Sequence, residues 1–233
     1  MCDRYVTPEA AHAEREFGVQ RAWWRFSPSF NVHPSRNVPV VRMHADEAEG
    51  VMLHWGLIPD WAEGDPAKAC ADYVAAETLE HSVATSGAWE RARRCIVPMF
   101  GFYAWQLTWE RHRQPFFVRL VNRPVFGVAA LWDRTVTEES DDVIESCALV
   151  TVPANPLMTE LQGMQTQMPA ILDRRDYSAW LTASPAAARL MLRSCPQQRM
   201  IAHPVSPRVN SLKYDDAQLI RPVEIETRGS LRA

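Results

Sequence analysis

Short runs rich in β-branched and aromatic residues follow one another along the chain, and no regular helical segment separates most of them. The runs cover residues 38–43, 51–55, 95–98, 116–121, 125–132 and 148–152. Such runs are typical of buried strands, whereas a parallel α/β sheet would need a helix between successive strands. Seventeen prolines against nine glycines also suit a loop-rich sheet protein. The pattern therefore predicts an α+β fold in a single domain.

A few helices are expected around this sheet. Thr7-Pro8-Glu9 is typical of a helix start, and this helix should end near Gly18. Residues 75–94 favour helix with an interruption at Ser86-Gly87, and Asp173 and Ser184 can cap two more helices. The runs 116–121 and 125–132 are expected to form a hairpin. We assign residues 1–224 to the domain and expect residues 225–233 to be a loose C-terminal tail.

Composition excludes several classes of protein. Hydrophobic residues make up 47% and charged residues 23% of the chain, as in ordinary globular proteins. No apolar run is long enough for a bilayer span and no secretion signal is evident, so we expect a cytoplasmic protein without a membrane partner. Five scattered cysteines and seven histidines lack metal-site spacing, and no phosphate-binding loop or serine-hydrolase motif occurs. We therefore expect no metal and no cofactor.

The chain begins Met1-Cys2-Asp3-Arg4-Tyr5. Removal of Met1 would leave Cys2 with an α-amine and a thiol on adjacent carbons. Such a 1,2-aminothiol can capture an aldehyde twice and close a five-membered ring, which an internal cysteine cannot do. The amine and thiol have ordinary pKa values of about 8 and about 8.5, so both are accessible near neutral pH.

Several motifs in a fixed order resemble the SRAP family, the SOS-response-associated peptidase-like proteins that shield abasic sites in single-stranded DNA. They are "MCDRY" at the start, "NVHP" from Asn31, "WGLIPDW" from Trp55, "RCIVPMFGFYAW" from Arg94, "LVTVPAN", "QTQMPAIL" and "HPVSPRVN" from His203. Together they span roughly residues 1–224. The resemblance implies mainly antiparallel sheets that form an open barrel-like core flanked by short helices.

The resemblance also implies a chemistry and its partner. Cys2 would be the nucleophile that crosslinks to the aldehyde of an abasic site in single-stranded DNA as a thiazolidine. Family positions that contact this DNA fall on Arg4, Asn31, Pro34, Trp61, Thr151 and Gln167. Asp3 replaces the family's glycine and adds a negative charge beside Cys2, which would repel phosphate.

Three polar helpers of the family are replaced in this sequence. Tyr73 stands where the family has asparagine, Ala104 where it has glutamate, and Gln165 where it has histidine. Ala75 and Gln167 take the places of two arginines, which predicts weaker DNA binding. Loss of a positioned acid or base typically costs about 10²–10⁴-fold in rate, so we expect impaired chemistry.

Three functions remain open from the sequence. Cys2 can still crosslink abasic DNA with altered helpers around it. Alternatively, the chain is a pseudoenzyme that binds DNA or another ligand without a covalent bond. The third is a thiol autopeptidase, although a cysteine and histidine pairing suited to it is not evident. The oligomeric state is not indicated.

Overall fold

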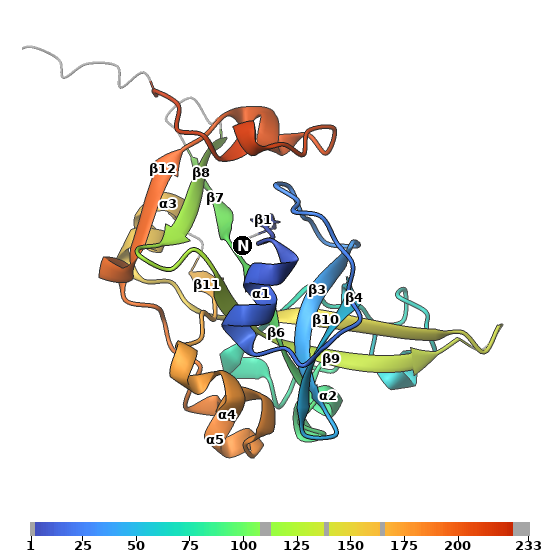
Figure 1. The fold of residues 1–233 in the computed structure, drawn as a ribbon. Helices are drawn as coiled ribbons and strands as arrows, with labels where there is room; N and C mark the ends of the chain where they lie inside the picture. Colours follow the sequence, from blue (N-terminus) through green and yellow to red (C-terminus); the bar gives the residue numbers. More distant parts are fainter. Residues whose placement is uncertain (1–2, 108–112, 138–139, 164–165, 226–233) are drawn as a thin grey trace, which may run out of the picture.

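A computed structural model describes residues 3–107, 113–137, 140–163 and 166–225 of the chain. Its centre is a five-stranded barrel, which confirms the predicted α+β class (Figure 1). The barrel strands are β3 (Asn37–His44), β4 (Glu47–Trp55), β6 (Arg94–Met99), β9 (Phe126–Val136) and β10 (Val143–Pro153). Neighbours run antiparallel in the order β10-β9-β6-β3-β4. A short parallel pairing of β10 with β4, at Ser146 and His54, closes the ring.

Further strands extend the barrel and build a second sheet beside it. β2 (Arg21–Ala22) pairs with β4, while β5 (Tyr73–Ala75) and β11 (Gln167–Pro169) both pair with β10. The second sheet is antiparallel, in the order β1 (Tyr5–Val6), β7 (Gly101–Leu107), β8 (Arg113–Leu120) and β12 (Met200–Pro204). Figure 1 shows this sheet to one side of the barrel, with the red C-terminal segment across its end.

Short helices flank the two sheets. The α-helices are α1 (Ala10–Phe17), α2 (Ser86–Glu90), α3 (Pro156–Gln162), α4 (Tyr177–Thr182) and α5 (Pro185–Arg189). The 3₁₀ turns are η1 (Asp60–Ala62), η2 (Ala76–Thr78), η3 (Arg174–Asp176), η4 (Gln197–Arg199), η5 (Pro207–Asn210) and η6 (Ala217–Ile220). Among the described residues, no helix is both long and apolar enough to cross a membrane.

Two predicted elements are wrong. Residues 75–94 are mostly not helical, because residues 73–75 pair with β10 as a strand and only residues 86–90 form an α-helix. That helix begins at Ser86-Gly87, where the sequence predicts an interruption. Residues 116–121 and 125–132 do not form a hairpin either. β8 pairs with β7 and β12, whereas β9 pairs with β6 and β10, so the turn at Asn122 (φ 58°) carries the chain from one sheet to the other.

The predicted first helix is confirmed, but its N-terminus differs in detail. Glu9 occupies the N-cap position, and Gly18 ends the helix in the left-handed region with φ 62°. The Thr7 hydroxyl instead accepts a hydrogen bond from the Ser29 backbone N–H at 2.7 Å. Thr7 therefore ties the N-terminal segment to the loop that precedes β3.

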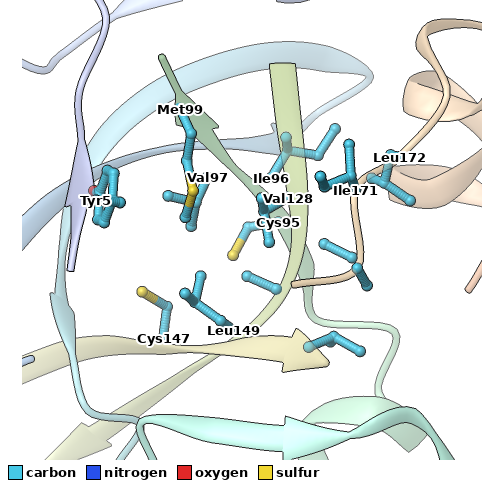
Figure 2. Packing of buried hydrophobic residues seen from close by; sticks show 14 of the residues in the cluster. Tyr5, Cys95, Ile96, Val97, Met99, Val128, Cys147, Leu149, Ile171 and Leu172 are labelled. Carbon is cyan, nitrogen blue, oxygen red and sulfur yellow. The ribbon is translucent and has the colours of Figure 1, made fainter. Parts of the chain in front are cut away.

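The barrel interior is apolar, and Figure 2 shows its packing around two thiols. Cys95 and Cys147 are fully buried, and burial raises the pKa of the Cys147 thiol to about 12. Cys195 is also buried. Cys70 differs, because its residue is exposed. Among the tryptophans on the strands, Trp55 is buried, whereas Trp105 and Trp132 are half-buried.

Asp173 is held by two arginines near the start of η3. Arg193 and Arg199 donate hydrogen bonds to its carboxylate at 2.6 and 2.5 Å and lower its pKa to about 2. An unfolded aspartate titrates near 3.9, so this pairing stabilises the fold above pH 4 and is lost as the pH falls through 2. We expect Asp173→Asn to lower the free energy of unfolding by about 1–2 kcal/mol at pH 7 and much less at pH 2. Urea unfolding of both proteins at the two pH values tests this; an equal difference at both would contradict it.

Candidate functional site

Arg4 connects the N-terminal strand to the C-terminal segment. Its Nη1 donates to Asn31 Oδ1 at 2.7 Å and to the Val209 carbonyl at 2.8 Å. Its own backbone carbonyl accepts from Tyr103 N–H at 3.0 Å, beside the pairing of β1 with β7. Partial burial lowers the pKa of the Arg4 guanidinium, although the Asp3 carboxylate opposes this shift. Nη1 of Arg4 therefore forms hydrogen bonds within the protein.

Asn31 is the centre of this connection. Its side chain is buried, and Nδ2 donates to the carbonyls of Val209, Ser211 and Tyr214 at 3.3, 3.1 and 2.8 Å. We call Arg4, Asn31 and these three carbonyls the N-terminal clamp. The asparagine of the "NVHP" motif therefore holds three backbone carbonyls of one C-terminal segment, residues 209–214, and also binds Arg4.

The loop before β3 is held to the same C-terminal segment by further bonds. Asp215 accepts from the Ser29 hydroxyl at 2.9 Å and from the Phe30 backbone N–H. The Tyr103 hydroxyl donates to the Phe30 carbonyl at 2.7 Å, and Trp105 Nε1 donates to Asn210 Oδ1 at 2.8 Å. Two residues of the "GFYAW" motif thus hold the loop and the segment together.

Trp55 joins the "NVHP" loop, the N-terminal strand and β5. Its ring lies 5.5 Å from that of Tyr5 and 5.8 Å, nearly edge-on, from that of Tyr73. Its carbonyl accepts from Ser35 N–H at 2.7 Å, which fixes the loop just after Pro34. The N-terminal strand, the residue after Pro34 and Tyr73 of β5 lie far apart in the sequence, and they therefore meet at one buried tryptophan.

Tyr73 contacts the beginning of the described chain. Its hydroxyl donates to Asp3 Oδ1 at 3.3 Å. Asp3 directly follows Cys2 in the sequence, so the residue at the family's asparagine position faces the N-terminal end of the chain. Cys2 and Gln165 themselves lie outside the described residues.

Ala104 lies in β7 opposite Phe116 and is fully buried among apolar side chains. A methyl group neither donates nor accepts a proton. The position that holds a glutamate in the family therefore offers no acid or base in this chain.

Thr151 and Gln167 lie on the strands beside Tyr73. Thr151 is in register with Ala75 of β5 and Pro169 of β11, and its buried hydroxyl donates to the Val74 carbonyl at 3.4 Å. Gln167 pairs with Pro153, and its Oε1 is buried without a hydrogen-bond partner in the described part of the chain. The Thr151 hydroxyl therefore holds the backbone of β5, whereas the Gln167 side-chain oxygen is buried without a hydrogen bond in the described part of the chain.

Trp61 stands on η1, with 48% of its surface exposed. Its turn is held by the ion pairs of Arg91 with Asp60 and Asp133, at 3.1 and 3.0 Å, and not by the clamp. An exposed indole can still stack on a base. The structure shows no contact between this residue and the other predicted site residues that it describes.

A groove of about 610 Å³ adjoins the clamp. Its walls include Thr7, Phe26, Asn31, His33, Arg36 and Asp215. His33 Nδ1 lies 2.6 Å from the Pro34 carbonyl, so the imidazole is fixed along one wall. The groove joins polar and apolar surface beside the N-terminal strand. Among the described residues, no group of three or more His, Cys, Asp or Glu side chains is arranged to hold a metal ion.

Sequence reasoning missed two residues beside this site, His54 and Asp72. Neither belongs to a motif. The only available signal was that His54 directly precedes Trp55 and Asp72 directly precedes Tyr73. Only the fold brings the two side chains together, next to Gly56.

Comparisons with known proteins agree with the fold and the motifs. Two abasic site processing proteins are similar: YoqW of Bacillus subtilis is 28% identical over 84% of this chain and 86% of its own length, and HMCES of Pongo abelii is 27% identical over 98% and 75%. A solved structure from Bacteroides thetaiotaomicron has a TM-score of 0.86 at 19% identity and covers 96% of this chain and 100% of its own. A structure from Bordetella bronchiseptica has a TM-score of 0.77 at 23% identity, over 88% and 100%. The model of the SOS response associated peptidase (SRAP) family matches residues 1–212, and the chain therefore belongs to this family.

Proposed function

We propose that this protein processes abasic sites in single-stranded DNA by forming a covalent thiazolidine through Cys2. Membership of the SRAP family and the similarity to proteins named for abasic site processing support this role. The observation that carries the proposal is the contact of Asp3 with Tyr73. This contact places Asp3, the residue that follows Cys2, against Tyr73. Tyr73 is the position where the family has an asparagine that assists the crosslinking reaction.

The chemistry follows from the adjacent amine and thiol once Met1 is removed. The amine of Cys2 adds to the aldehyde carbon of the opened sugar, and the resulting carbinolamine loses water to give a Schiff base. The thiol sulfur then adds to the imine carbon, and its proton ends on the nitrogen. One aldehyde and one aminothiol thus give one thiazolidine and one water.

Two features indicate slow rather than abolished reaction. The alanine at position 104 provides no proton, and a tyrosine at position 73 can hydrogen-bond an oxygen but shuttles protons poorly near neutral pH. The amine and thiol of Cys2 need no partner to be chemically competent. We therefore propose a retained nucleophile with weakened assistance.

The decisive experiment compares the protein with Cys2→Ala on a single-stranded oligonucleotide that carries one abasic site. We expect the wild type to give a heat-stable adduct on a denaturing gel and Cys2→Ala to give none, because alanine cannot close the ring. A version with one extra residue left ahead of Cys2 keeps the thiol but not its α-amine, and should also fail. Equal adduct yields from all three proteins would refute the proposal.

Non-covalent binding of DNA is the second candidate, favoured by the loss of a polar group at Ala104. In that case the wild type would retain the oligonucleotide in a native gel but give no adduct after denaturation. Arg4 and Asn31, as proposed DNA-contacting positions, would then act by shaping the groove wall, since Asn31 lines the groove and binds Arg4 Nη1.

A further inference from the structure

Three ionisable side chains converge on Gly56, at the seam where β10 closes the barrel. A Cβ placed on Gly56 would lie 3.2 Å from Cys70 Sγ and 3.4 Å from both Asp72 Oδ1 and His54 Nε2. Gly56 has φ 137°, a conformation that other residues rarely adopt. Even a methyl group would be crowded at this position, so the thiol, the carboxyl and the imidazole lie close together around Gly56.

The backbone of Asp72 connects this cluster to the candidate site. The Asp72 carbonyl accepts from Trp55 Nε1 at 3.0 Å, and Asp72 precedes Tyr73, whose hydroxyl reaches Asp3. Burial raises the pKa of the Asp72 carboxyl, the charge of Asp3 raises it further, and His54 opposes the shift. Asp3, Asp72 and His54 thus share one electrostatic environment.

The two groups suit opposite halves of a proton transfer. An imidazole nitrogen can accept a proton from a thiol, whereas the raised pKa of the Asp72 carboxyl lets it keep its proton to a higher pH than an ordinary aspartate. Neither side chain has a hydrogen-bond partner among the described residues. Both residues are half-buried, and His54 lines a surface hollow, so the two side chains are accessible from solvent.

We propose that His54 and Asp72 are the proton-transfer pair of this protein, in place of the family's glutamate and histidine. This inference rests on the proposed function. Asp72 would deliver the proton that the carbinolamine hydroxyl needs to leave as water, while the nitrogen lone pair forms the C=N bond. The Asp72 carboxylate would then take back the proton that the iminium nitrogen loses, which leaves a neutral imine. His54 would accept the thiol proton as sulfur adds to the imine and return it to the nitrogen.

Cys70 is not assigned a nucleophilic role. Burial raises the pKa of its thiol, and the Asp72 carboxylate raises it further. The thiol therefore stays protonated near neutral pH, and a protonated thiol is a poor nucleophile.

His54→Ala with added imidazole tests the assignment. His54 lines a surface hollow of about 590 Å³, which is large enough to admit free imidazole. We expect adduct formation with the abasic oligonucleotide to slow by about 10²-fold and to recover at least in part with imidazole. His81→Ala, at an exposed histidine, is the matched control and should neither slow the reaction nor respond to imidazole.

Asp72→Asn, which cannot supply a proton, should slow adduct formation by a similar factor. Thermal unfolding and retention of a non-reactive abasic analogue should match the wild type for both variants, which separates lost chemistry from lost folding. If both variants react at the wild-type rate while Cys2→Ala does not react, the proton-transfer pair is refuted and the proposed function stands. If the wild type itself forms no adduct, the proposed function fails and the inference fails with it.

Discussion

Replacement of Asn31 by alanine is expected to lower the free energy of unfolding by about 2–4 kcal/mol. The substitution removes the donor to three backbone carbonyls and the acceptor of Arg4 Nη1 in one step. Because Asn31 is buried, water cannot easily replace these bonds, and each unsatisfied buried group costs about 1–3 kcal/mol. Urea unfolding followed by tryptophan fluorescence measures the loss.

Asn210→Ala provides the matched control on the same C-terminal segment. Asn210 is exposed and accepts a single hydrogen bond from Trp105 Nε1, so its loss should cost no more than about 1 kcal/mol. Amide hydrogen exchange should also accelerate in residues 207–216 of Asn31→Ala before the barrel is affected. If Asn31→Ala is as stable as Asn210→Ala, the clamp is not a stabilising unit.

The barrel strands were predictable because they are apolar in sequence and buried in the fold. Residues 95–98 and 148–152, for example, fall within β6 and β10. The hairpin prediction failed since the β8–β9 connection resembles an ordinary turn, and only long-range pairing shows that the two strands belong to different sheets. Residues 75–94 have helical composition, but pairing of Tyr73–Ala75 with β10 and the 3₁₀ turn after it override that preference.

The site was predictable only where motifs marked it. Motif positions predicted Arg4, Asn31 and Tyr73 as site residues. The fold connects Arg4 to Asn31 through the clamp, and Tyr73 to the N-terminal strand through Trp55. The internal bonds of Arg4 could not be foreseen, because they depend on a carbonyl 205 residues away. The meeting of His54 and Asp72 at Gly56 likewise depends on how the loop after β4 returns to the barrel.

Arg94 is a buried cation that holds the C-terminal end of α4. It is 2% exposed, its Nε donates to the Trp180 carbonyl at 2.5 Å, and its Nη2 donates to the Ala183 carbonyl. The guanidinium carbon lies 5.8 and 5.7 Å from the rings of Trp89 and Trp180. A cation suits both the carbonyl end of a helix and the faces of two indoles. No carboxylate forms an ion pair with it in the part of the chain that the structure describes.

We expect Arg94→Ala to lower the free energy of unfolding by about 4 kcal/mol, through two unsatisfied carbonyls and a cavity between the indoles. Arg94→Met fills most of that volume and removes a charge whose burial is itself unfavourable, so it should cost about half as much. Arg119→Met, at an exposed position of β8, should change stability by less than about 0.5 kcal/mol. Urea unfolding of the three variants gives the order. If Arg94→Met were as stable as the wild type, desolvation of the cation would cancel its hydrogen bonds, and the carbonyls of α4 would have to be satisfied in another way.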